Sequence, residues 1–132
     1  MIEVQVKLKE KGIDLSLKGH AGYAEKGKDI VCAAVSALAI ALEIALRKSE
    51  VKKHCDFREN TDSGLYEISI DGIRNKECLR ITESYLYMFL SGLLFLQEHY
   101  PANICVKCGF SESEAVSTPQ VLKLFERREV IG

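Results

Sequence analysis

The chain has 132 residues, the size of one domain, and 47% of them are apolar, which is enough for a single packed core. Its 18 Lys and Arg residues oppose 19 Asp and Glu residues, so it lacks the basic surplus of a dedicated nucleic-acid binder. Its five cysteines form no even, regularly spaced set, which argues against a disulfide framework and favours reduced thiols.

The apolar segments favour a protein without a membrane anchor. The longest uncharged apolar stretch, residues 84–97, is shorter than the roughly 20 helical residues that cross a bilayer. The first residues begin an alternating strand pattern at once, without the basic and apolar regions of a signal peptide. We therefore expect a cytoplasmic protein with no membrane contact.

The first 18 residues predict a β-hairpin. Apolar and polar residues alternate over residues 2–8 and again over residues 13–17, which is the pattern of half-buried strands. The segment between them, residues 9–12, contains a glycine and fits a turn.

A loop and then a helix follow the hairpin. Residues 19–28 hold three glycines and no sustained periodicity, which predicts a loop. Asp29 then precedes an Ala-rich run that ends near Lys48, so we expect a helix over residues 30–48 with Asp29 as its N-cap.

Two more strands are predicted over residues 51–58 and 65–70, joined by a turn at residues 59–64. A second helix is expected over residues 77–100, because Asn75 can cap its start and Pro101 ends it. Residues 104–108 predict a short last strand, and the polar stretch after Gly109 predicts a loop that leads, at Pro119, into a short terminal helix.

The predicted order of elements indicates an α+β fold with two layers. Two main helices would pack on one face of a mixed or antiparallel sheet of about five strands, with a short C-terminal helix added. The second helix is apolar nearly all round, since four apolar residues lie off its main stripe: Ile81, Tyr85, Met88 and Phe95. Either a homodimer interface or the chain's own C-terminal tail could cover that second face.

One histidine and one cysteine stand out as candidates for chemistry. Cys32 lies in the first turn of the first predicted helix, where unpaired backbone N–H groups and the helix dipole favour a thiolate. His20 lies in the preceding loop, which could fold back and bring an imidazole base to the sulfur. Position alone favours the simpler interpretation, an ordinary buried helical cysteine and a solvated loop histidine.

The sequence around these two residues favours the catalytic interpretation. Residues 19–23 read Gly-His-Ala-Gly-Tyr, and residues 27–36 read Gly-Lys-Asp-Ile-Val-Cys-Ala-Ala-Val-Ser. Together they resemble the signature of the ribosomal-processing cysteine proteases, known as Prp. The resemblance implies that residues 1–109 form a single cysteine protease domain, with residues 110–132 as a C-terminal extension.

The family resemblance also implies a mechanism and a substrate. His20 and Cys32 would form the catalytic dyad of a cysteine endopeptidase. The substrate would be the N-terminal extension of the precursor of bacterial large-subunit ribosomal protein twenty-seven, with aromatic or aliphatic residues beside the scissile bond. A homodimer is implied too, and no cofactor, metal or direct contact with nucleic acid is expected.

Supporting roles can be assigned to neighbours of the dyad. Asp29 could orient His20 or only cap the helix, which is the commoner role of Asp there. Ser36 lies one turn after Cys32 and would form a pocket wall or a packing contact. The backbone N–H groups of Cys32 and Ala33 are candidate oxyanion donors. The loop glycines could act as hinges: Gly19, Gly22 and Gly27.

Two other interpretations remain open. Cys105 and Cys108 have the spacing of a zinc knuckle or redox pair, although plain strand cysteines are the simpler explanation and a thiol redox sensor is the third possibility. The main alternative to a protease is a ribosome-associated assembly factor that binds a peptide without cutting it.

Overall fold

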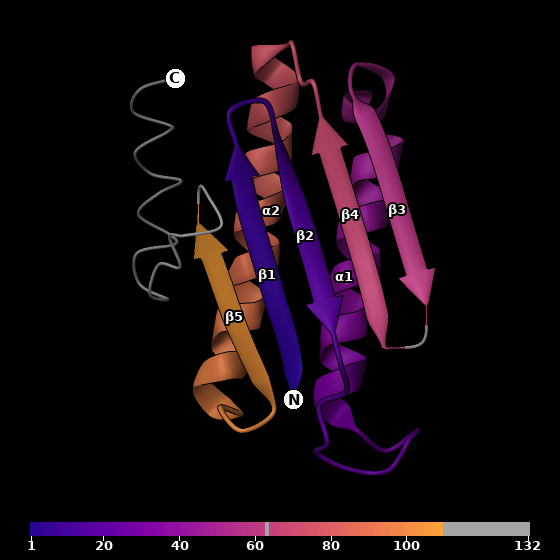
Figure 1. Cartoon of the computed structure of the whole chain (residues 1–132), viewed down its shortest axis with the longest axis vertical. Coiled ribbons are helices and arrows are strands. Elements are labelled where there is room, and N and C mark those ends of the chain that lie inside the picture. The colour runs from indigo at the N-terminus through magenta and orange to yellow at the C-terminus, as the bar shows by residue number, and fades with distance from the viewer. Residues whose placement is uncertain (63, 110–132) are drawn as a thin grey trace.

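The computed structural model describes residues 1–62 and 64–109, which form a sheet covered on one face by helices (Figure 1). This arrangement confirms the predicted α+β fold with two layers. The predicted C-terminal helix and the rest of the 110–132 extension lie outside the described residues. The strands are β1 (Ile2–Lys9), β2 (Gly12–Lys18), β3 (Asp56–Asp62), β4 (Leu65–Asp71) and β5 (Ile104–Gly109), and the helices are α1 (Ile30–Lys48), the short 3₁₀ helix η1 (Glu50–Lys53) and α2 (Lys76–His99).

The sheet is mixed, with the strand order β3-β4-β2-β1-β5. β1 pairs antiparallel with β2 and parallel with β5, so Val4 lies opposite Leu17 on one side and Val106 on the other. The remaining pairs, β2 with β4 and β3 with β4, are antiparallel. The first hairpin therefore occupies the middle of the sheet, and the last strand of the described chain completes one edge beside the N-terminus.

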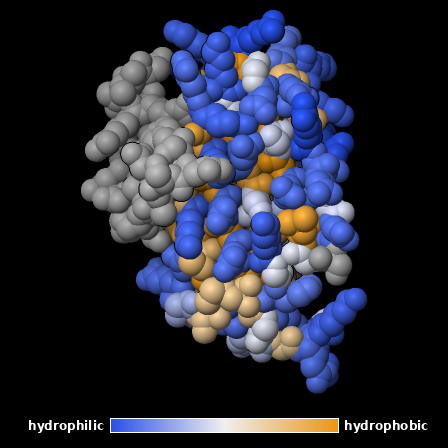
Figure 2. All heavy atoms as spheres, in the orientation of Figure 1, coloured by the Kyte–Doolittle hydropathy of each residue, from blue (hydrophilic) through white to orange (hydrophobic). Residues whose placement is uncertain are grey.

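Alternation along the strands divides the sheet into a buried and an open face. The buried set continues across neighbouring strands because residues paired in register point to the same side, as Val6, Leu15 and Ile68 do. The helices α1 and α2 cover this face (Figure 1). The opposite face carries mainly charged and polar side chains, and it is the largely hydrophilic surface turned toward the viewer in Figure 2.

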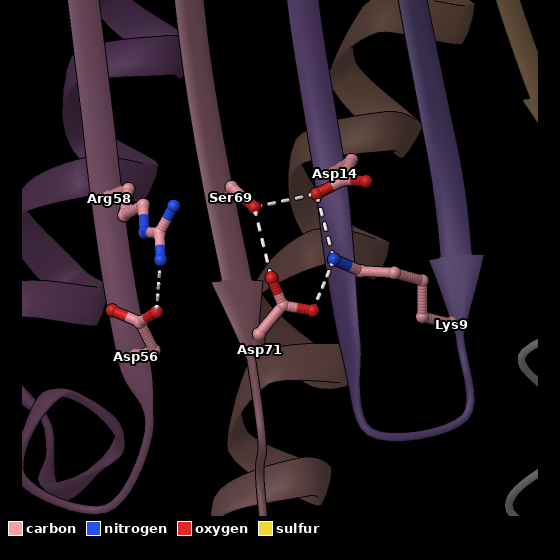
Figure 3. Close-up of polar contacts among 6 residues, drawn as sticks. All are labelled: Lys9, Asp14, Asp56, Arg58, Ser69 and Asp71. Carbon is pink, nitrogen blue, oxygen red and sulfur yellow. Dashed lines mark hydrogen bonds and ion pairs between the residues drawn. The ribbon is translucent and has the colours of Figure 1, made fainter.

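Charged groups on the open face form a small network across three strands (Figure 3). Lys9 Nζ lies 2.9 Å from Asp14 Oδ1 and also contacts Asp71, while Ser69 Oγ donates a hydrogen bond of 2.7 Å to Asp14. Partial burial acts against ionisation of Asp14, but the bonds from Ser69 and Lys9 outweigh it, so the pKa of this carboxyl falls below its usual value. The network aligns the β1–β2 turn with β4.

Helix α1 begins and ends with side chains suited to its two termini. Asp29 caps its start, and Arg47 and Lys48 in its last turn complement the negative end of the helix dipole. The helix is long and apolar enough to cross a membrane by length and composition, a test that the core helix of a soluble protein also passes. In the fold its buried residues face the sheet: Val31, Val35, Ala39, Leu42 and Leu46.

Helix α2 packs beside α1, and the two approach each other at a glycine. A Cβ atom at Gly92 would lie 2.9 Å from Leu38 Cδ1, so the missing side chain lets Leu38 fit against α2. Asn75 caps α2 as predicted, accepting a hydrogen bond of 2.8 Å from Glu77 N. Of the residues off its main stripe, Met88 and Phe95 remain exposed. Ile81 and Tyr85 pack against the core.

The predicted strand over residues 51–58 was placed wrongly. Its first residues form η1, where Val51 is buried, and β3 instead covers Asp56–Asp62, most of which had been predicted to be a turn. β3 lies at the edge of the sheet and only Phe57 is partly buried, so its sequence lacks the alternation that identifies a strand.

Candidate functional site

The loop between β2 and α1 forms the wall of two adjacent cavities around the start of α1. One, of about 570 Å³, lies along α1 and toward β2 and β4; the other, of about 680 Å³, lies between the loop and the helix start. Three predicted site residues line both cavities: His20, Cys32 and Ser36. Open space therefore reaches Cys32 from two sides.

The two cavities differ in the side chains that they offer. The cavity along α1 is lined mostly by apolar residues, among them Leu17, Val35, Ala39, Ile40 and Leu65. The cavity beside the loop has small and charged residues, including Ala24, Lys26, Gly27 and Asp29. A polypeptide that crosses Cys32 would thus meet large apolar side chains on one side and small and charged side chains on the other.

Cys32 lies in the first turn of α1, half-buried, as predicted. Its sulfur accepts a hydrogen bond from the backbone N–H of Ala21, with 3.3 Å between nitrogen and Sγ. This contact fixes the position of the sulfur between the loop and the start of the helix, beside both cavities.

Asp29 fastens the loop to the start of the helix. Its Oδ1 accepts a hydrogen bond of 2.9 Å from Cys32 N, and its Oδ2 accepts bonds of 3.0 Å from Tyr23 N and 3.2 Å from Ala24 N. The N–H of Cys32, followed by those of Ala24, Tyr23 and Val31, outweighs partial desolvation and lowers the pKa of this carboxyl. The side-chain bonds described for Asp29 thus go to the backbone, in the manner of a cap.

The two backbone groups proposed as oxyanion donors already have acceptors in this conformation. Cys32 N donates to Asp29 Oδ1, and Ala33 N donates to the Asp29 carbonyl oxygen at 3.1 Å. Either group would have to share its hydrogen to bind an oxyanion.

His20 is exposed, and its ring lies against the turn between β3 and β4. A Cβ atom built on Gly64 would lie 3.2 Å from His20 Nε2, and Gly19 N donates a hydrogen bond of 2.8 Å to Gly64 O. Within residues 1–62 and 64–109, no hydrogen bond joins the His20 ring to Cys32. The structure brings the two residues to the same cavities without connecting them directly.

The three loop glycines all adopt positive φ, with values of 94° at Gly19, 68° at Gly22 and 88° at Gly27. Other residues rarely take this conformation, so the path of the loop depends on them. A Cβ atom at Gly19 would also lie 2.5 Å from the carbonyl oxygen of Met1, whereas the other two have free space around them.

Comparison with known families identifies the family of this chain. A family model described as cysteine protease Prp matches residues 1–105. This chain belongs to the Prp family of cysteine proteases. No match was found among curated proteins.

Solved structures of similar proteins agree with this assignment. The essential ribosomal processing protease Prp from Staphylococcus aureus, in complex with a covalently linked product peptide, is 27% identical, with a TM-score of 0.67 over 83% of this chain and 100% of its own. The same protease with a substrate peptide is 26% identical, with a TM-score of 0.62 and the same coverage. The protein SMU.848 from Streptococcus mutans is 31% identical, with a TM-score of 0.59 over 82% of this chain and 93% of its own.

The two strand cysteines of this Prp family member do not form a pair. Successive residues of a strand point to opposite faces, so Cys108 is buried in the core while Cys105, three positions earlier, lies on the open face. Burial raises the pKa of the Cys108 thiol to about 11. Among the described residues no group of three or more His, Cys, Asp or Glu side chains could hold a metal ion.

Several residues around the site were not predicted from sequence. Gly64 contacts His20, Tyr66 lines the apolar cavity, and Asn103 donates a hydrogen bond to the loop. All three come from later parts of the chain, and only the folded sheet brings them to the start of α1. A glycine within a predicted turn and an asparagine before a short strand are too common to mark a site.

Proposed function

We propose that this protein is an endopeptidase that removes the N-terminal extension of the precursor of large-subunit ribosomal protein twenty-seven. The observation that carries the proposal is the position of Cys32 between two open cavities, with His20 lining both. Membership of the Prp family supports the chemistry, and the peptide complexes of the Staphylococcus aureus protease support a peptide substrate.

In the proposed reaction the Cys32 thiolate attacks the carbonyl carbon of the scissile bond and forms a tetrahedral intermediate. His20 takes the thiol proton and gives it to the leaving amine, which releases the C-terminal product and leaves an acyl-enzyme. Water, activated by the same imidazole, hydrolyses the thioester and restores the thiol. His20 would have to turn from Gly64 toward the sulfur for these steps, which is a motion that substrate could induce.

The apolar cavity supports a preference for aliphatic or aromatic residues on one side of the scissile bond. Leu17 of β2, Leu65 of β4 and Ile40 of α1 line it, and its lining residues on α1 extend from Cys32 to Glu43. The eleven steps from Cys32 to Glu43, at about 1.5 Å each, span about 16 Å, the length of roughly five residues of an extended peptide.

A homodimer is part of the proposal. Several large apolar side chains of the two helices remain exposed, and covering them in a second copy would remove apolar surface from water. They are Ile30 and Ile44 of α1 and Tyr87, Met88 and Phe95 of α2. Equilibrium sedimentation should give twice the monomer mass, and Met88→Glu should lower it toward that of the monomer.

A mass-spectrometric cleavage assay on the organism's own precursor would test the peptidase. We expect specific cleavage by the native protein, and a loss of at least about 100-fold in Cys32→Ala and His20→Ala. Cys105→Ala and His54→Ala are the matched controls, since Cys105 faces the open side of the sheet and His54 is the exposed residue that follows η1. Both controls should cleave at the native rate.

The absence of a His20–Cys32 hydrogen bond among the described contacts favours one alternative, an assembly factor that binds the precursor without cutting it. We propose a cytoplasmic location for either function. If the native protein binds the precursor without cleaving it, and Cys32→Ala binds it equally well, the protein is the assembly factor and the peptidase is contradicted.

A further inference from the structure

The turn between α2 and β5 contacts the loop that carries His20, although the two segments are far apart in sequence. Asn103 Nδ2 donates a hydrogen bond of 2.9 Å to the carbonyl oxygen of Ala21, across 82 positions. The rings of Tyr23 and Tyr100 meet edge to face, with their centroids 5.5 Å apart. The loop is thus held from this turn at two points.

Asn103 is itself held firmly. Its backbone N–H donates to the Tyr100 carbonyl oxygen at 2.9 Å, and its carbonyl oxygen accepts a hydrogen bond of 2.9 Å from Ile2 N at the start of β1. The next strand residues pair with β1, and Gln97 Oε1 accepts a hydrogen bond of 2.6 Å from Val106 N. The side-chain amide therefore projects from a rigid part of the fold.

Ala21 transmits this constraint to the nucleophile. The residue is only 2% exposed and belongs to the core, its carbonyl oxygen accepts from Asn103, and its N–H donates to Cys32 Sγ. A residue held at its carbonyl and its side chain has little freedom to turn its N–H away. Ala21 also directly follows His20, so the same constraint limits the backbone position from which the His20 side chain extends.

We propose that Asn103 is a positioning residue of the proposed peptidase: by holding the Ala21 carbonyl, it keeps the Ala21 N–H directed at Cys32 Sγ and the sulfur reactive. The inference rests on the proposed function for its effect on turnover. Its effect on the sulfur itself does not require that any peptide be cleaved.

Asn103→Asp is the sharpest variant, because a carboxylate of the same size cannot donate to the carbonyl and repels it. Asn103→Leu removes the donor without adding charge and serves as a second variant if the first fails to fold. Asn75→Ala is the control, since it deletes the cap of α2 and costs about 1 kcal/mol of stability far from the loop. Urea unfolding would establish how much stability each variant loses.

The first readout is the rate constant at which iodoacetamide alkylates Cys32 in the full-length protein at pH 7.5, followed by mass spectrometry of the Cys32 peptide. Both Asn103→Asp and Asn103→Leu should weaken the hydrogen bond from Ala21 N–H to Cys32 Sγ, which carries negative charge as it reacts. Loss of this one bond should lower the alkylation rate constant of Cys32 about tenfold. Asn75→Ala should react as the native protein does. In the cleavage assay the same variants should lower kcat by a similar factor and change KM by less than about twofold.

Native alkylation rates in both Asn103 variants would overturn the inference, and so would equal slowing in Asn75→Ala, because stability would then explain the effect. If the native protein cleaves no precursor while alkylation still depends on Asn103, the proposed function fails and the positioning role stands. If the precursor is cleaved normally by both Asn103 variants, the positioning role fails and the peptidase stands.

Discussion

Gly64 lies directly against the imidazole of His20, and a methyl group added to Gly64 would lie 3.2 Å from His20 Nε2. The ring thus lies close to the backbone of the β3–β4 turn at Gly64, a residue without a side chain. Because Gly19 N also bonds to Gly64 O, this turn sets the position of the loop just before the histidine. The β3–β4 turn therefore acts on the candidate site through Gly64.

Gly64→Ala should therefore lower kcat for cleavage while the free energy of unfolding falls only slightly. The φ of 70° at Gly64 makes the substitution cost about 1 kcal/mol, and the new methyl group would displace the His20 ring, for which we expect about a tenfold fall in kcat. Gly72→Ala is the matched control, because Gly72 has a φ of 69° and no atom within 4 Å of the added group. Equal kcat in the two variants would contradict the role of the turn.

Asp29→Asn should weaken the attachment of the loop in a manner that depends on pH. The native pKa of Asp29 is lowered, so its stabilisation is fully present above the unfolded value of about 4 and is lost as pH falls through the lower native value. We expect Asp29→Asn to be less stable than the native protein at pH 7, with a difference that shrinks below about pH 4.

Urea unfolding at pH 7 and pH 3 would measure that difference for Asp29→Asn. Asp56→Asn, on the exposed edge strand, is the control and should be nearly neutral at pH 7. A difference between Asp29→Asn and the native protein that stays constant from pH 7 to pH 3 would show that the charge of Asp29 does not hold the loop.

Gly12→Ala should destabilise the fold far more than alanine at a loop glycine does. A Cβ atom at this position in β2 would lie 1.8 Å from the backbone oxygen of Ile70, which cannot move without breaking the pairing with β4. We expect a loss of more than about 3 kcal/mol in the free energy of unfolding. Gly22→Ala, with φ of 68° and free space, should cost only about 1 kcal/mol, and a similar loss in both would contradict the close approach.

Lys9→Met should have a small effect despite the network in Figure 3. The Lys9 side chain is 31% exposed and its partners Asp14 and Asp71 are more exposed, so water screens the attraction. We expect a loss of less than about 1 kcal/mol, smaller still in 0.5 M salt. A larger loss that persists in high salt would mean that packing of the lysine stem, rather than charge, holds the β1–β2 turn.

The sequence predicted the fold where its patterns were strong. The alternation over residues 2–8 and 13–17 identified the central hairpin, and the caps Asp29 and Asn75 marked the helix starts. Edge strand β3 was misplaced because exposed residues on both faces carry no alternation. Sequence could propose His20 and Cys32 from their motif. It could not find Asn103 or Gly64, since their contacts depend on strand order and the parallel pairing of β5 with β1.

The parallel pairing of β5 with β1 has a consequence for when the protein becomes active during its synthesis. β1, the loop and α1 are synthesised first, but the amide that holds Ala21 belongs to Asn103, and Ile2 N finds its acceptor on the same residue. Contacts between such distant parts of a chain form late in folding. While the chain is being synthesised, His20 and Cys32 are therefore present before Asn103, which fixes the loop between them. The Cys32 thiol would take its reactive position only after β5 has paired with β1.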